Sequence, residues 1–177
     1  MEEAGTNSKR RPHVLSVVAL NVPGLLARVI ELFSGRGYNI EKLSVGHAES
    51  NKHRKGREKG ALSRITVVST GTDAEASVII THLKNKILDV LEVQDLTDNP
   101  DAVQADVTLV KVFVSRTDKQ ADAGTIARGF RAMVILTKPK YLVFRFIGRE
   151  DASRDFIAAM RRFGPVESST TGITAIA

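Results

Sequence analysis

The sequence predicts an α+β protein built from two successive β-α-β-β-α-β units. Short apolar segments typical of strands alternate with stretches of helical periodicity, and this order of elements occurs twice. A turn-rich segment, Asp98–Asp101, separates the two occurrences. Each unit has about 80 residues, enough for one split βαβ, or ferredoxin-like, motif.

The first unit is expected over residues 13–98, after a polar tail, residues 1–12, that we expect to be disordered. Its strands are apolar or alternate in polarity, and its helices carry apolar residues at helical spacing. The expected strands are His13–Leu20, Ile40–Ala48, Ala61–Thr70 and Ile87–Leu96, and the expected helices are Val22–Arg36 and Thr72–Lys86.

The second unit is expected over residues 99–177 and repeats the same pattern. In its clearest strand, Leu142, Phe144 and Phe146 alternate with residues of the opposite face, as in a half-buried strand. The expected strands are Val107–Ser115, Ala132–Thr137, Tyr141–Gly148 and Val166–Ile176, and the helices are Lys119–Arg131 and one from Glu150 to Gly164-Pro165. Open sheets leave exposed edges, so we expect pairing between subunits.

The composition is that of a soluble globular protein, with 42% hydrophobic and 26% charged residues. The absence of cysteine excludes a disulfide framework, a thiol nucleophile and a zinc site with cysteine ligands. No apolar run has the roughly 20 residues of a membrane span. The first residues lack the apolar core of a signal peptide, so cytoplasm is expected, or an organellar matrix if a transit peptide has been removed.

The net charge of +6 is concentrated in Asn51–Gly60, where five Lys and Arg accompany one Glu. Such a run is typical of a solvated loop between strands. The alternative is a contact with a phosphate group, a nucleotide or an acidic partner. The candidate contact residues are Lys52, Arg54, Lys55, Arg57 and Lys59.

The sequence contains no recognisable catalytic or metal-binding set. It lacks the nucleophile-elbow, zinc-protease and phosphate-loop motifs. Its four histidines, His13, His47, His53 and His82, are scattered without ligand spacing. We therefore predict no catalytic residue and no metal site.

The turn between the first strand and the first helix is the strongest candidate for ligand binding. Asn21 is placed to cap the helix, Pro23 suits its first turn, and Gly24 permits close approach of another group. Gly37 is expected in the left-handed conformation after the helix, just before Asn39. Free N–H groups at a helix start attract a carboxylate, and side-chain amides can bind an ammonium group. The pattern predicts a pocket for a small zwitterion, with an ordinary helix cap as the alternative.

These motifs resemble a known family. Asn-x-x-Gly-x-Leu-x-Arg-Val at 21–29 and Phe-Ser-x-Arg-Gly-Tyr-Asn-Ile-Glu-x-Leu at 33–43 resemble the ACT domain of the regulatory small subunit of acetohydroxyacid synthase (acetolactate synthase). The further matches follow in the family's order, and they are Leu62–Val67, Asp89–Val93, Leu109–Val112, Phe130-Arg131 and Phe163–Glu167. The likeness runs from about Pro12 to Ile176, so 13–98 corresponds to the ACT domain and 99–177 to the C-terminal small-subunit domain.

The resemblance implies a non-catalytic regulatory subunit that activates a catalytic large subunit and confers feedback inhibition by valine. In the family two ACT domains pair side by side, and valine binds at their interface. The corresponding residues here are Asn21, Val22, Pro23, Gly24, Leu25, Asn39 and Ile40, with Asn39 contributed by the other subunit. The resemblance also implies a homodimer or higher oligomer, with thiamine diphosphate, Mg and FAD held by the catalytic partner. Leucine and isoleucine are alternative candidate ligands, and the sequence does not decide among the three.

The chain departs from the family pattern in two places. The family commonly has a short, non-basic connection where this chain has Asn51–Gly60, and some members also respond to a nucleotide. The family's closing strand usually carries Arg where this chain has Thr170, two residues before Gly172. The basic segment also keeps a second function open, that of an amino-acid-responsive nucleic-acid-binding regulator, although nucleic acid is the less expected partner.

Overall fold

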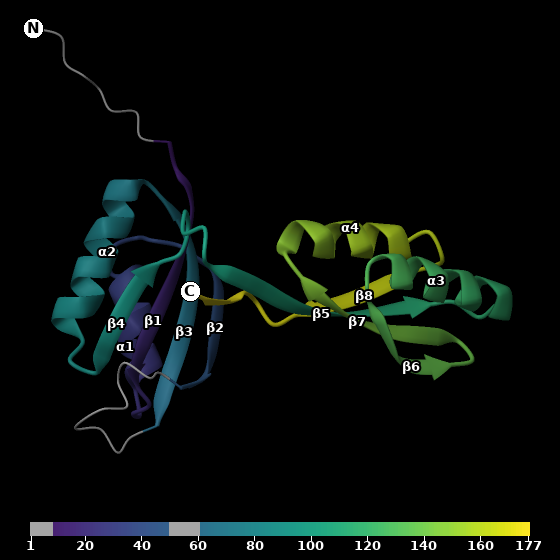
Figure 1. The fold of residues 1–177 in the computed structure, drawn as a ribbon, viewed down its shortest axis with the longest axis horizontal. Helices are drawn as coiled ribbons and strands as arrows, with labels where there is room; N and C mark the ends of the chain where they lie inside the picture. The colour runs from purple at the N-terminus through teal and green to yellow at the C-terminus, as the bar shows by residue number, and fades with distance from the viewer. Residues whose placement is uncertain (1–8, 50–60) are drawn as a thin grey trace, which may run out of the picture. The chain divides into compact units, whose positions relative to one another are not determined.

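The computed structural model describes residues 9–49 and 61–177, and Figure 1 shows their fold. Contacts divide the chain into two compact units. One unit extends to Val103 and includes Ala175–Ala177, and the other is Gln104–Thr174. The division expected from the sequence, after Asp98, falls within the turn that precedes the strand beginning at Val103.

The first unit is a four-stranded antiparallel sheet with two helices, in the β-α-β-β-α-β order predicted from the sequence. The strands are β1 (Arg11–Leu20), β2 (Ile40–Ala48), β3 (Leu62–Gly71) and β4 (Val90–Asp95), and the helices are α1 (Leu25–Ser34) and α2 (Asp73–Lys86). The strand order is β2-β3-β1-β4, which leaves β2 and β4 at the edges.

The core of this unit lies between the sheet and both helices. Leu15, Val17 and Ala19 alternate along β1 and are fully buried, because they face the helices. They pack with apolar residues of α1 and α2, among them Phe33 and Leu83. Alternation in the strands and helical spacing in the helices therefore place one continuous apolar face on each element.

Local signals fix the ends of α2. Thr72 forms a capping box with Glu75, because the Thr72 hydroxyl accepts from the Glu75 N–H (3.2 Å) and the Glu75 carboxylate accepts from the Thr72 N–H (2.8 Å). The Thr72 backbone N–H, together with Arg10, lowers the pKa of Glu75. Lys84 and Lys86 lie in the last turn, where cations are favoured by the helix dipole.

The second unit repeats the fold of the first. Its strands are β5 (Val103–Phe113), β6 (Met133–Lys138), β7 (Tyr141–Gly148) and β8 (Val166–Thr170), and its helices are α3 (Thr117–Gly129) and α4 (Glu150–Met160). The strand order β6-β7-β5-β8 corresponds position by position to that of the first sheet. The predicted fold class, two ferredoxin-like units, is confirmed.

The core of the second unit is rich in aromatic residues. Phe144 and Phe146 of β7 face the helices, and both pack against Phe156 of α4, with ring centroids 6.0 and 5.4 Å away. Phe130 contributes a third ring at 5.4 Å from Phe156. Figure 1 shows α3 and α4 on the same side of this sheet. The opposite face of β7 carries residues that are exposed or half-buried, among them Ile147.

The predicted single strand Val166–Ile176 is two strands, β8 and β9 (Thr174–Ile176), and both pair with β5. The interruption falls at Gly172, whose φ of 78° lies in the left-handed region and breaks the extended conformation. Thr170, the residue that stands where the family carries Arg, donates its hydroxyl hydrogen to the buried Asp106 carboxylate at 2.8 Å. A neutral hydroxyl group therefore donates the hydrogen bond to the Asp106 carboxylate at the end of β8.

Candidate functional site

The turn between β1 and α1 begins at Asn21 and ends at Gly24. The Asn21 N–H donates to the Ala61 carbonyl (2.8 Å), and the Asn21 side chain is exposed. The prediction that Asn21 caps the helix is wrong: α1 begins at Leu25, its N-cap is Gly24, and no side chain caps it. Pro23 therefore precedes the helix instead of lying in its first turn. The left-handed Gly24 (φ 78°, ψ −2°) separates Pro23 from the helix.

Gly24 is required for its backbone conformation. A Cβ atom built on it would meet no atom of the described chain within 4 Å, so no neighbouring group demands its small size. A φ of 78° is a conformation that residues with a side chain rarely adopt. The close approach expected at Gly24 is thus not made by residues 9–49 or 61–177, and these residues leave the space beside its Cα open.

The start of α1 offers backbone donors. The Leu25 N–H donates to the Val22 carbonyl (3.2 Å), and the Arg28 N–H donates to the Gly24 carbonyl (3.1 Å). The N–H groups of Leu26 and Ala27 have no acceptor within residues 9–49 and 61–177. No acidic residue lies in this first turn, so a carboxylate from outside would meet free donors and the positive end of the helix dipole.

Side chains near the turn divide between the core and solvent. Leu25 is buried in the core cluster, and Val22 packs against that cluster while remaining partly exposed. Pro23 is exposed. Arg28, which sequence reasoning did not single out as a site residue, forms an ion pair with Asp89 at 2.6 Å. Arg28 lies in the motif at 21–29 and Asp89 begins the matching segment Asp89–Val93, so the family resemblance could have pointed to both residues.

Asn39 is held by the end of α1 and by β3. The Tyr38 N–H donates to the Phe33 carbonyl (3.1 Å) and the Gly37 N–H to the Ser34 carbonyl (3.0 Å), which is a Schellman motif. Gly37 has φ 71°, so the predicted left-handed conformation is confirmed. The buried Ser69 hydroxyl then donates to the Asn39 carbonyl at 2.8 Å. These contacts fix the Asn39 backbone, and its side chain is exposed.

The two parts of the candidate site lie at opposite ends of the same sheet. Leu20, which precedes Asn21, pairs with Leu62 of β3, whereas Ile40, which follows Asn39, pairs with Ser69. Seven residues of β3 separate these two levels, which corresponds to roughly 23 Å at about 3.3 Å per residue. One copy of the chain therefore does not bring Asn21 and Asn39 together.

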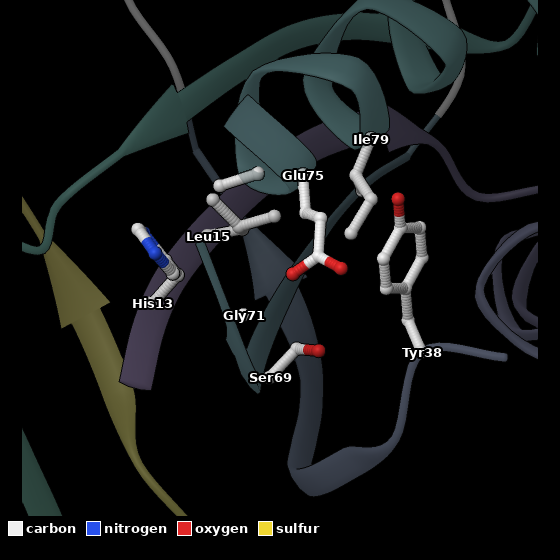
Figure 2. A pocket seen from close by; sticks show the side chains of 8 residues that line it. His13, Leu15, Tyr38, Ser69, Gly71, Glu75 and Ile79 are labelled. Atoms are coloured by element: carbon white, nitrogen blue, oxygen red, sulfur yellow. The ribbon is translucent and has the colours of Figure 1, made fainter. Parts of the chain in front are cut away.

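A shallow hollow, open to solvent, lies on the Asn39 end of the sheet (Figure 2). It is lined by His13, Leu15, Tyr38, Ser69, Gly71, Glu75, Ala76 and Ile79. Glu75 reaches into it from α2, but its carboxylate already accepts from the Thr72 N–H and forms an ion pair with Arg10 (3.1 Å). The hollow is shallow and its acid is already engaged, so it does not form the predicted ligand pocket.

His13 borders this hollow and is almost fully buried. Its Nδ1 lies 3.4 Å from an Asp95 oxygen and its Nε2 lies 3.5 Å from an Asp73 oxygen. Arg11 donates to the same Asp73 at 2.9 Å and to Asp98 at 2.8 Å. The guanidinium of Arg11 lowers the pKa of Asp98. These contacts tie β1 to α2, to the end of β4 and to the turn after it.

Other predicted features lie elsewhere or outside the described residues. The basic candidates Lys52, Arg54, Lys55, Arg57 and Lys59 lie outside them. Among the side chains that the structure describes, no group of three or more His, Asp or Glu could hold a metal ion. No helix in the described ranges is long and apolar enough to cross a membrane.

Comparison with protein families gives two matches that together span most of the chain. Residues 15–92 match the family model described as the AHAS small subunit-like ACT domain. Residues 105–177 match the family model for the small subunit of acetolactate synthase. The two matches correspond to the two units of the fold.

Individual relatives have the same description. The chain is 33% identical over 166 residues to the acetolactate synthase small subunit of Aquifex aeolicus, covering 94% of this chain and 81% of that protein. It is 32% identical over 164 residues to a probable acetolactate synthase small subunit of Archaeoglobus fulgidus, covering 93% and 95%. The crystal structure of the Thermotoga maritima small subunit shares the fold, with a TM-score of 0.79 at 24% identity over 94% of this chain and 96% of that chain.

Proposed function

This chain belongs to the family of acetolactate synthase small subunits, and on that premise we propose that two copies bind valine between their ACT domains and so inhibit the catalytic subunit. A small subunit is a regulatory subunit that is not catalytic by itself, and membership in the family implies partnership with the catalytic large subunit. Thiamine diphosphate, Mg and FAD are accordingly proposed for that partner. The nucleic-acid-binding alternative rested on the basic segment, and family membership favours the regulatory function.

The observation that carries the proposal is the separation of Asn21 and Asn39 along β3. β2 is an edge strand and can pair with β2 of a second copy about a two-fold axis. Such antiparallel pairing sets Ile40 of one copy beside Ala48 of the other. Ala48 lies at the level of Leu62, which is the end of the sheet that carries the Asn21 turn. A second copy thus supplies Asn39 to the end where the first copy offers Asn21.

The chemistry of the two parts suits a small amino acid. The carboxylate of valine would accept from the N–H groups of Leu26 and Ala27, which have no acceptor among the described residues, at the positive end of α1. The amide oxygens of Asn21 and Asn39 can accept from the ammonium group. The described residues leave space beside Gly24 for the ligand, and the partly exposed Val22 offers an apolar surface to the isopropyl group.

A site shared by two copies couples ligand binding to the dimer. Valine would favour the arrangement in which both parts face each other, and the catalytic subunit would respond to that change in population. Coupling of this kind is worth about 1–3 kcal/mol, or roughly a 5–150-fold change in affinity. Leucine and isoleucine differ from valine only in the apolar side chain, so both belong in the same titration.

Calorimetric titration of the full chain with valine tests the proposal. Asn21→Ala and Asn39→Ala should each weaken binding about tenfold or more, because each removes a hydrogen bond to a charged group of the ligand. Asn85→Ala, which changes an exposed asparagine of α2, is the matched control and should bind normally. In the holoenzyme, the same two variants should lose inhibition by valine and keep the stimulated activity. Normal binding by both variants would contradict the assignment.

A further inference from the structure

The edge strand β6 exposes apolar side chains on both of its faces. Met133, Val134, Ile135 and Leu136 are 55%, 44%, 48% and 40% exposed. Successive side chains of a strand point to opposite faces, so a strand covered by helices on one face buries every second residue. Every residue of β6 is exposed instead. Four large side chains, each about half exposed, form a patch of a few hundred Å², a size that is often functional.

The corresponding edge strand of the first unit differs. β2 occupies the same position in its sheet as β6 does in the second sheet. Its apolar residues alternate with polar ones, and Ile40 and Leu43 pack against the core. The exposed apolar run is therefore particular to β6 and is not imposed by the fold that both units share.

The ends of β6 are basic and discourage pairing of two copies of the strand. The strand ends at Lys138, followed by Pro139 and Lys140, and Arg131 lies just before it. Antiparallel self-pairing centred between Val134 and Ile135 would set Arg131 opposite Lys138 of the second copy, and like charges placed opposite each other are destabilising. Lysine, proline and a bulge are the features that protect sheet edges from self-association. The register between β6 and β7 shifts at Ile135, which supplies the bulge.

The basic residues at the ends of β6 attract a strand with acidic ends. Residues 104–174 carry twelve Lys and Arg against seven Asp and Glu, so an acidic segment is drawn to this unit as a whole. Arg145 of β7 pairs in register with Met133, which adds a third cation next to the strand. Gln120 donates to the carbonyls of Lys138 (3.0 Å) and Val114 (2.9 Å), which fixes the basic end of β6 on the unit.

We propose that the edge of β6 is a docking site for an extended segment of the catalytic subunit with an apolar centre and acidic flanks. The segment adds a strand to the sheet: backbone hydrogen bonds supply affinity, Met133–Leu136 select apolar side chains, and the basic ends select acidic ones. The inference rests on the proposed partnership with the catalytic subunit, but it is independent of the valine site, which lies in the other unit.

Two variants of the full chain test the proposal against the purified catalytic subunit. Ile135→Asp places a carboxylate at the centre of the patch, and the double variant Lys138→Glu/Lys140→Glu reverses the charge at its end. Each should weaken association with the catalytic subunit about tenfold or more, and the double variant should also reduce the dependence of association on salt. Binding is measured by interferometry and by stimulation of acetolactate formation. All three residues are exposed, and circular dichroism with a cooperative urea-unfolding transition verifies that each variant is folded.

Matched controls come from exposed residues of the first unit. Leu88→Asp introduces the same charge at an apolar residue that is 93% exposed, and Lys84→Glu/Lys86→Glu reverses two exposed lysines of α2. Both controls should associate normally. Normal association of the β6 variants would overturn the proposal. Light scattering on the isolated variants tests whether β6 pairs with a second copy of the chain. A changed oligomeric state of the β6 variants, together with normal association with the catalytic subunit, would show such pairing and would also overturn the proposal.

Discussion

Gly24 allows the energy of a backbone conformation to be measured without an accompanying clash. Its φ is 78°, and a Cβ would meet no described atom within 4 Å. Gly24→Ala should therefore cost only the left-handed conformation, about 1–2 kcal/mol of the first unit's free energy of unfolding. Gly24→Asn should cost less, because asparagine adopts this conformation more readily than alanine.

The assay is urea unfolding followed by hydrogen exchange and mass spectrometry on peptides of β1 and α1, which report on the first unit alone. Gly129→Ala is the control. Gly129 lies in the last turn of α3 and has no positive φ, and a Cβ added to it would meet no described atom within 4 Å, so this substitution should be neutral or slightly stabilising. A loss above about 3 kcal/mol for Gly24→Ala would imply a clash. No loss would refute the conformational argument.

Three further substitutions test the hydrogen bond that holds Asn39, the close packing at Gly164 and the lowered pKa of Glu75. Ser69→Ala removes the hydrogen bond to the Asn39 carbonyl (2.8 Å) and should weaken valine binding several-fold by calorimetry, with unchanged circular dichroism. Gly164→Ala would place a Cβ 2.0 Å from a β5 carbonyl oxygen and should lower the melting temperature of the second unit by more than about 5 °C. The lowered pKa of Glu75 stabilises the fold above its ordinary pKa of 4.5, and this contribution is lost as pH falls through the lowered value. Glu75→Gln should therefore flatten the fall of stability in acid, as measured by urea unfolding at pH 3 to 6.

The sequence predicted most of the fold because its signals are local. Alternation at Leu142, Phe144 and Phe146 indicated one buried face, and the helix expected over Thr72–Lys86 agrees with α2 to within one residue. The repetition of the element order was enough to predict two units with the same topology. Periodicity and capping depend on neighbouring residues, so a single chain is sufficient to read them.

The start of α1 was predicted incorrectly because two local preferences agreed on the wrong residue. Asn21 and Pro23 have the preferred types for an N-cap and a first turn, yet the left-handed Gly24 begins the helix later. The same kind of residue, Gly172, divides the closing strand. At both positions the glycine adopts a left-handed conformation, which the pattern of neighbouring residues does not predict.

Contacts between distant segments were not readable from the sequence. The hydrogen bond from Ser69 to Asn39 joins β3 to the residue that precedes β2, and nothing near either residue in the sequence indicates it. The apolar run at β6 predicts a buried strand by its composition, whereas the position of β6 at the sheet edge leaves it exposed. The separation of the two parts of the candidate site likewise depends on the strand order, which periodicity does not supply.

Mixing the Asn21→Ala and Asn39→Ala variants, each of which should bind valine weakly, tests the shared site most directly. Asn21→Ala and Asn39→Ala homodimers each lack one component of both sites. In a mixed dimer, one site carries both substitutions. The other site is intact, because the Asn39→Ala copy supplies its Asn21 and the Asn21→Ala copy supplies its Asn39. We predict that mixing and reassembly restore valine binding at close to normal affinity and at one site per mixed dimer. If the mixture binds no more valine than either variant alone, the site lies within a single chain and the proposed interface is wrong.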